Sequence, residues 1–345
     1  MKLNDFIAEY KPVLQTSLEN YLNGRAKEYE HVPFYKDTLD RLYLFSTSGK
    51  MLRGLLILLI YSFFEKLTHD SKAFSAAAAM ELIQSALLVH DDIIDNDEMR
   101  RGKKTIYSQY ADYGKEKNYP QSNLFGRNVG ICVGDIAIFL AFDLLSCSSD
   151  KVEISASIIR LFARETHLVA IGEMIDVDMA SNQTEPTVAQ IIEMYRYKTA
   201  RYSFLLPFAA GAQLGGATPE FIAKLGELGE STGILFQIQD DWLGLYGTEG
   251  EIGKPVGSDL REKKKTIYRS LLIEAASEEE RKIIDLLSVE ETLGFLKRYE
   301  IENKVNEYKI KYETKSIEII NTFPFSEDQK RVLLEVVDLI IKRKN

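Results

Sequence analysis

An apolar helical run that ends in a cluster of carboxylates constrains this chain more than any other stretch. It occupies residues 81–105, where ELIQSALLVH leads directly into DDIIDNDEMRRGKKT. A helix turns about 100° per residue, so Asp91, Asp92 and Asp95 share one face. Carboxylates that share a face repel one another unless a cation neutralises them, and oxygen ligands of this kind suit magnesium. The stretch therefore predicts a helix that leaves a core and carries a metal site at its end.

Two arginines, Arg100 and Arg101, follow these acids at once. The guanidinium fork matches phosphate oxygens in bidentate fashion, and magnesium commonly bridges carboxylates to substrate phosphates. For an isolated acidic cluster, a solvated helix end is the ordinary alternative. The apolar run before this cluster favours a site for a polyanion at the edge of a core.

A second cluster of acids at the end of an apolar helical run occurs far downstream, in FQIQDDWLGL at residues 236–245. We call the cluster at residues 91–95 the first acidic step and this one the second acidic step. Asp240 and Asp241 again follow an apolar helical run, and Gln237 lies one helical turn before Asp241. Two such steps suggest two walls of one cavity.

The composition excludes several classes of function. Hydrophobic residues make up 45% of the chain, charged residues 28%, and the net charge is −9, which is typical of a soluble globular protein and disfavours nucleic-acid binding. Cys132 and Cys147 form neither a metal pattern nor a disulfide framework, so we expect a cytoplasmic protein. The most apolar run, residues 52–64, is interrupted by Arg53 and is too short to span a bilayer, so we expect a chain that does not span a membrane.

Helix dominates the predicted secondary structure. Apolar residues recur mainly at three- and four-residue spacing and the chain holds eight prolines, so an all-α fold is expected. Long helices are predicted over residues 3–27, 154–179 and 221–244. Residues 107–127 are polar, rich in tyrosine and interrupted by glycine and proline, and we interpret them as a loop.

Taken together, these motifs resemble the trans (E) isoprenyl diphosphate synthases of the polyprenyl synthetase family. That family pairs two DDxxD-type motifs, the first followed by RRG and the second by GKPVGSDL and a lysine–threonine pair, all of which have counterparts here. The resemblance covers roughly residues 47–266. It implies one domain over residues 1–345, an isoprenoid synthase-type helical bundle around a deep central cavity, usually found as a homodimer.

The resemblance also implies a role for individual residues. Magnesium ions, three with substrate bound, would be held by Asp91, Asp92, Asp95, Asp240 and Asp241. The allylic diphosphate would contact Arg100, Lys198, Thr199, Gln237, Lys254 and Lys264. Isopentenyl diphosphate would be held by Lys50, Arg53, Gln84 and Arg101. The residues expected to act in catalysis are Asp91, Asp92, Asp95, Arg100, Lys198, Asp240 and Lys254.

The sequence departs from the family pattern at two single positions and in one segment. Gly244 takes the place of the last aspartate of the second motif, which leaves Asp240 as the main metal ligand there. Glu173 stands where the family often has glutamine. The segment SGKMLRG keeps Lys50 and Arg53, the two charges of a GGKRxRP-like element, but departs from that element at Ser48, Met51 and Gly54.

The implied reaction is the head-to-tail condensation of isopentenyl diphosphate with an allylic diphosphate, which releases pyrophosphate and gives an all-trans product. Ala86 lies five residues before Asp91, where a bulky aromatic tends to stop chain growth in this family. With its neighbour Leu87, Ala86 is expected to set the product length at geranylgeranyl or longer. A farnesyl diphosphate synthase is the alternative. A class I terpene cyclase, which needs no homoallylic site, and a non-catalytic regulatory homologue, suggested only by Gly244, are further alternatives.

Overall fold

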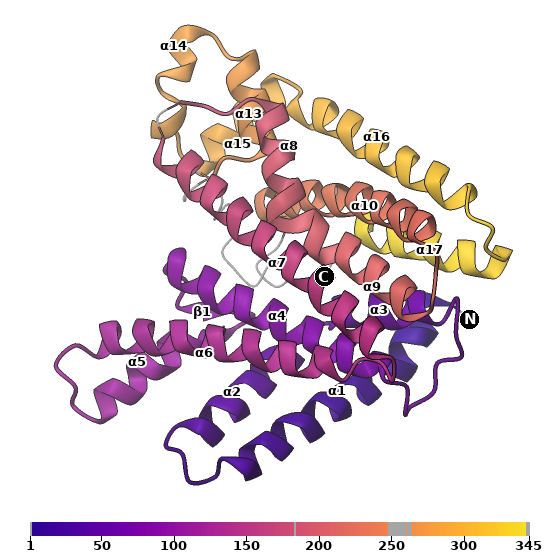
Figure 1. Cartoon of the computed structure of the whole chain (residues 1–345). Coiled ribbons are helices and arrows are strands. Elements are labelled where there is room, and N and C mark those ends of the chain that lie inside the picture. The colour runs from indigo at the N-terminus through magenta and orange to yellow at the C-terminus, as the bar shows by residue number, and fades with distance from the viewer. Residues whose placement is uncertain (1, 183, 248–259, 261–263, 343–345) are drawn as a thin grey trace. The chain divides into compact units, whose positions relative to one another are not determined.

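A computed structural model describes residues 2–182, 184–247, 260 and 264–342 of the chain. The described part is almost entirely helical (Figure 1), which confirms the predicted all-α class. The elements are α1 (Leu3–Glu28), α2 (Tyr35–Thr47), α3 (Leu52–Tyr61), α4 (Ala73–Ile94), β1 (Met99–Arg100), β2 (Lys103–Lys104), α5 (Ile106–Glu116), α6 (Ser122–Ser146), α7 (Val152–Ser181), α8 (Val188–Tyr195), the π-helix η1 (Arg196–Leu205), α9 (Leu206–Leu214), α10 (Pro219–Tyr246), α13 (Ile267–Ala275), α14 (Glu278–Arg281), the 3₁₀-helix η2 (Ile284–Leu286), α15 (Val289–Arg298), α16 (Ile301–Asn321) and α17 (Glu327–Ile341).

The chain divides into two compact units. The first unit consists of Met1–Phe162 and Pro207–Ile222, and the second of Ala163–Leu206 and Ala223–Asn345. Each unit has its own buried residues, and each carries one of the two acidic steps. That residues 1–345 act as one domain stays a prediction.

In the first unit the core is built around α4. The side chains of Ala76 to Ala79 are fully buried, and such small residues let neighbouring helices approach closely. Helices α3 and α6 pack against α4, and Leu14 and Leu18 of α1 are also fully buried. This packing fixes α4 along its length and so determines where its acidic end lies.

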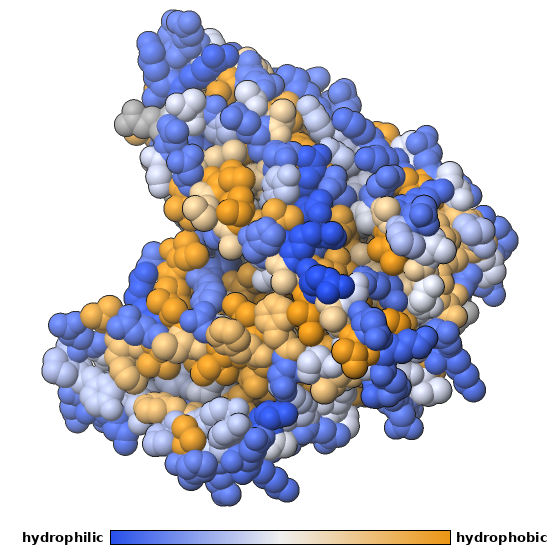
Figure 2. All heavy atoms as spheres, viewed as in Figure 1, coloured by the Kyte–Doolittle hydropathy of each residue, from blue (hydrophilic) through white to orange (hydrophobic). Residues whose placement is uncertain are grey.

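Two described helices, α4 and α6, are long and apolar enough to cross a membrane by length and composition alone. In α4, 78% of the apolar window is buried inside the protein, whereas in α6 the share is 44%. The apolar character of α4 therefore belongs to the core. Helix α6 exposes large apolar side chains, among them Leu124, Ile131 and Phe139, and Figure 2 shows apolar side chains along this helix.

The interpretation of residues 107–127 as a loop is wrong. Helix α5 covers the first half of that range and α6 begins at Ser122, so only a short turn separates them. The glycines that suggested a break are contact points: a Cβ at Gly126 would lie 2.4 Å from the carbonyl oxygen of Tyr107. Tyr107 and Tyr110 are buried in this helical hairpin, so tertiary packing outweighs the helix-breaking tendency of the local sequence.

In the second unit, close helix contacts surround η1. A Cβ at Gly172 of α7 would lie 2.4 Å from the backbone nitrogen of Lys198, and one at Gly233 of α10 would lie 2.5 Å from the Cα of Ala200. Glycine at these two positions lets α7 and α10 approach η1 at backbone distance. This places Lys198 and Thr199 directly beside both helices.

Candidate active site

The last turn of α4 carries the first acidic step, with Asp95 at the C-cap. Carboxylates at a helix C-terminus lie at the negative end of the helix dipole, which raises the cost of their charge. Arg100 offsets this cost: its Nε lies 2.6 Å from Asp92 Oδ1, and one of its terminal nitrogens lies 3.1 Å from Asp91 Oδ2. The predicted site residues Asp91, Asp92 and Arg100 therefore meet in one cluster.

A short β-hairpin with a two-residue turn places Arg100 beside these acids. Strands β1 and β2 pair Met99 with Lys104 and Arg100 with Lys103. Arg101 and Gly102 occupy the turn with positive φ angles of 50° and 71°, the conformation that suits tight hairpins. The RRG sequence thus folds back on itself beside the end of α4.

Asp92 is the most deeply buried of the three acids, and burial raises the pKa of its carboxyl group to about 7, although Arg100 lowers it. Within the described part of the chain its Oδ2 atom is buried and has no hydrogen-bond partner. A buried oxygen of this kind has spare capacity for a cation or a donor.

Basic residues gather around the segment that precedes α3. Lys11 Nζ donates to the carbonyl oxygen of Gly49 at 2.9 Å, and Arg101 donates to Ser48 Oγ at 3.2 Å. Lys50 and Arg53 flank Met51, which adopts a left-handed φ of 54° at the N-cap of α3. The structure thus brings the predicted residues Lys50, Arg53 and Arg101 to one place.

A buried carboxylate supports this basic cluster from within α4. Glu81 is 4% exposed and accepts a hydrogen bond at 2.7 Å from the backbone nitrogen of Gly54. Burial raises the pKa of Glu81, while the charges of Arg53, Arg101 and Lys11 lower it. Sequence reasoning missed this residue, because a single glutamate in an apolar helix carries no local motif.

Three further predicted residues, Gln84, Ala86 and Leu87, lie on α4 before the acids. Gln84 is 8% exposed, and its Oε1 atom has no hydrogen-bond partner among the residues that the structure describes. Ala86 is fully buried, and Leu87 is half-buried. All three precede Asp91 by at most two helical turns.

In the second unit, Lys198 lies within the π-helix η1. Its Nζ is 2.9 Å from a carboxylate oxygen of Glu173 and 2.5 Å from one of Asp176, both on α7. π-helical segments often occur at functional sites. The structure therefore places Glu173, the departure from the family pattern, in direct contact with a predicted substrate-binding lysine.

Hydrogen bonds connect Thr199 to the second acidic step. Thr199 Oγ1 donates to Gln237 Oε1 at 2.8 Å, and Gln237 Nε2 donates to Asp241 Oδ1 at 3.0 Å. The other carboxylate oxygen of Asp241 accepts from the hydroxyl group of Tyr195. Asp241 is 4% exposed, whereas Asp240 is exposed, so the two neighbouring acids have different surroundings.

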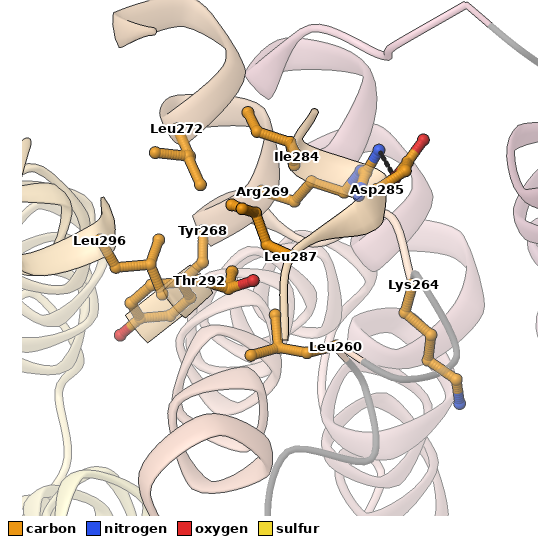
Figure 3. A pocket seen from close by; sticks show the side chains of 10 residues that line it. All are labelled: Leu260, Lys264, Tyr268, Arg269, Leu272, Ile284, Asp285, Leu287, Thr292 and Leu296. Carbon is orange, nitrogen blue, oxygen red and sulfur yellow. Dashed lines mark ion pairs between the residues drawn. The ribbon is translucent and has the colours of Figure 1, made fainter. Parts of the chain in front are cut away.

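A small cavity of about 110 Å³ lies near the start of α13, and its lining side chains are drawn in Figure 3. It is lined by Leu260, Lys264, Tyr268, Arg269, Leu272, Ile284, Asp285, Leu287, Thr292 and Leu296. Arg269 pairs with Asp285 at 2.8 Å on one side, and the ammonium group of Lys264 points away from the apolar side chains. The predicted residue Lys254 lies outside the described residues.

The donor chemistry of the acidic steps suits a hard divalent cation, because carboxylate oxygens are the preferred ligands of magnesium. Within each stretch that the structure describes, however, no three acidic, histidine or cysteine side chains come close enough to hold a metal ion. The assignment of Asp91, Asp92, Asp95, Asp240 and Asp241 as metal ligands stays a prediction.

Comparison with known proteins identifies the family. The family model described as "Polyprenyl synthetase" matches residues 38–297. A geranylgeranyl diphosphate synthase of Saccharolobus solfataricus is 32% identical over 272 residues, covering 77% of this chain and 75% of that protein. A farnesyl diphosphate synthase of Geobacillus stearothermophilus is 31% identical, covering 81% of this chain and 87% of that protein.

A solved structure has the same fold over nearly the whole chain. The geranylgeranyl pyrophosphate synthase of Corynebacterium glutamicum, complexed with isoprenyl diphosphate and magnesium, is similar with a TM-score of 0.89 at 26% identity, covering 99% of this chain and 100% of that one. The helical architecture, the placement of the motif residues and these similarities agree. The chain belongs to the polyprenyl synthetase family and is a trans-prenyltransferase of the all-α isoprenoid synthase fold.

Proposed function

We propose that this protein condenses isopentenyl diphosphate with an allylic diphosphate to give geranylgeranyl diphosphate or a somewhat longer all-trans product. The observation that carries the proposal is the cluster at the end of α4, where Arg100 contacts both Asp91 and Asp92. A guanidinium group held between carboxylates is suited to a diphosphate–metal complex, because it can exchange its carboxylate partners for phosphate oxygens.

The basic cluster before α3 is the proposed site for isopentenyl diphosphate. Lys50, Arg53 and Arg101 supply the positive charge, and Gln84 supplies an amide group. Lys11 and Glu81 fix the backbone of this segment at Gly49 and Gly54. A fixed basic cluster binds a diphosphate without first having to be ordered.

The allylic diphosphate is proposed to bind Arg100, Lys198, Thr199, Gln237 and Lys264, and Lys254 on grounds of the family resemblance. Magnesium would be held mainly by Asp91, Asp95 and Asp240, with Asp92 and Asp241 beside them; that the C. glutamicum relative is complexed with magnesium supports this. When bound, the metal supplies positive charge to the leaving diphosphate. Three ions are proposed with substrate present.

The protein residues then have two tasks. Arg100 and Lys198 hold the diphosphate and stabilise the negative charge that develops as the allylic carbon–oxygen bond breaks. The double bond of isopentenyl diphosphate attacks the allylic cation, a new carbon–carbon bond forms, and a proton leaves from the adjacent carbon. We propose that the released pyrophosphate accepts this proton. His90 is not assigned this task, because its ring contacts the carbonyl oxygen of Ile131 at 3.2 Å.

We further propose a cytoplasmic homodimer that uses α6. The apolar window of this helix is less than half buried, and Phe139 is 73% exposed. Exposed apolar faces of this kind mark association sites. The cytoplasmic part of the proposal is supported by Cys132 and Cys147, which are both free, as expected in a reducing compartment. Sedimentation analysis of the wild type and of Phe139→Glu tests the dimer: the variant should sediment as a monomer, and a wild-type monomer would refute it.

The reaction is tested with purified protein, magnesium, labelled isopentenyl diphosphate and, in separate reactions, dimethylallyl, geranyl, farnesyl and geranylgeranyl diphosphates. Chromatography of the dephosphorylated products should show label in prenols of geranylgeranyl length or longer. Products that stop at farnesol would indicate a farnesyl diphosphate synthase. Consumption of primer without incorporation of label would indicate a cyclase, and no turnover of any primer would indicate a non-catalytic protein.

A further inference from the structure

The side chain of Tyr195 joins three segments of the second unit. It is the last residue of α8 and is 2% exposed. Its hydroxyl group donates to Asp241 Oδ2 on α10 and accepts a hydrogen bond at 2.9 Å from the backbone nitrogen of Ile267, the first residue of α13. One buried hydroxyl thus acts as both donor and acceptor between segments that are distant in sequence.

Tyr195 is also part of a chain of hydrogen bonds between two helices. Thr199, four residues after Tyr195, donates to Gln237, and Gln237 donates to Asp241, four residues further along α10. Residues four apart lie on the same face of a helix. Tyr195 of α8 and Thr199 of η1 therefore contact Asp241 and Gln237 of α10, respectively. Both carboxylate oxygens of Asp241 receive hydrogen bonds from protein groups.

We propose that Tyr195 is a positioning residue for the allylic diphosphate site, an inference that rests on the proposed function. By holding Asp241 inside the unit, its hydroxyl group orients the second acidic step so that Asp240 is the acid presented to ligand. By accepting from Ile267, it fixes the start of α13, three residues after Lys264. These two hydrogen bonds of one hydroxyl group therefore set the positions of Asp240, on α10, and of Lys264, which precedes α13.

The backbone of Ile267 gives a test that does not depend on catalysis. The first N–H groups of a helix have no partner within the helix and ordinarily exchange with solvent quickly. Hydrogen exchange of the metal-free wild-type protein should instead show Ile267 protected to a degree similar to the interior residue Leu271. Fast exchange at Ile267 in the wild type would overturn the proposal, whatever the enzyme does.

The matched variants are Tyr195→Phe and Tyr110→Phe. Tyr110 is also a buried tyrosine that donates to a carboxylate, Asp37, at 2.8 Å, but it lies in α5. Tyr195→Phe should speed exchange at Ile267 at least about tenfold and raise the KM for the allylic diphosphate about tenfold, while the KM for isopentenyl diphosphate stays unchanged. Tyr110→Phe should change neither KM.

Equal effects of the two variants on both substrates would reduce Tyr195 to a purely structural role and refute the proposal. A stronger apparent affinity of Tyr195→Phe for magnesium would also refute it, because Asp241 would then act as a ligand that Tyr195 restrains. If the wild type has no prenyltransferase activity, the proposed function fails, yet the exchange of Ile267 still shows whether Tyr195 anchors α13.

Discussion

The side-chain carboxyl group of Glu81 accepts a hydrogen bond from the backbone nitrogen of Gly54 at 2.7 Å and so ties the middle of α4 to the start of α3. Gly54 has no room for a side chain, since a Cβ there would lie 2.7 Å from the carbonyl oxygen of Ala77. The hydrogen bond therefore depends on glycine at position 54, because the close approach of α3 and α4 brings the backbone N–H of Gly54 to Glu81.

Glu81→Gln should make stability less dependent on pH. Burial raises the pKa of Glu81, so the folded protein keeps the proton at pH values where the unfolded chain has lost it. The free energy of unfolding of the wild type should therefore fall as pH rises above the ordinary glutamate pKa. Glutamine keeps an acceptor for Gly54 and does not titrate. Thermal unfolding at pH 5 and pH 7.5 measures this, with the exposed Glu116→Gln as control; equal pH dependence in all three proteins would refute it.

Enlarging Ala86 should shorten the product in proportion to the added volume. Ala86 is fully buried, so Val, Leu and Phe at this position should cost about 1–3 kcal/mol of stability and progressively block the proposed path of the growing chain. Product chromatography reads the effect directly. Ala78→Leu, at a fully buried alanine in the same helix, should cost similar stability without changing product length. Unchanged products from Ala86→Phe would move the floor of the cavity to other residues, such as Leu82 or Ile83.

Replacing Arg100 by lysine should reduce kcat/KM for the allylic diphosphate about 10- to 100-fold. Lysine keeps the charge but loses the planar fork that now contacts Asp91 and Asp92 together, and charge-assisted hydrogen bonds of this type are among the stronger ones. Lys104→Gln is the control, because Lys104 pairs with Asp112 on the surface of the same segment. Steady-state kinetics with the charge-conserving Arg100→Lys at wild-type rate would show that the fork is not needed.

Glu173→Gln should lower the KM for the allylic diphosphate about two- to fivefold. Lys198 is shared between Glu173 and Asp176, and removing one of these charges leaves its ammonium group more readily available to a phosphate oxygen. Glu193→Gln tests whether any lost charge in this unit has the same effect, because Glu193 pairs with Arg196 and not with Lys198. A higher KM in Glu173→Gln would mean that Glu173 orients the lysine for binding.

Long helices could be predicted from sequence because their periodicity extends over many turns. The prediction of residues 3–27 agrees with α1 at Leu3–Glu28, and that of residues 221–244 lies within α10 at Pro219–Tyr246. The hairpin of α5 and α6 was missed because Gly114, Pro120 and Gly126 read locally as breakers. In the structure the two glycines lie where the helices touch and the proline lies in the turn.

Motif residues of the site could also be predicted, but their supporting residues could not. Asp91 and Arg100 are close in sequence and belong to one recognisable stretch. Tyr195 lies 46 residues from its partner Asp241, and Glu81 lies 27 residues from Gly54. Neither belongs to a recognisable local motif, and only the packing of a second helix against it gives it a partner.

The hairpin of α5 and α6 determines where this protein tolerates added sequence. Tyr113 stacks on Phe125 with ring centroids 6.2 Å apart, and Tyr119 contacts Phe125 edge-on. Aromatic contacts therefore join α5 and α6 as far as the turn. Only residues 117–121 connect them outside the helices. A fluorescent label or a fused domain inserted after Asn118 would extend from the tip of the hairpin, whereas the same insertion a few residues earlier or later would separate the two helices.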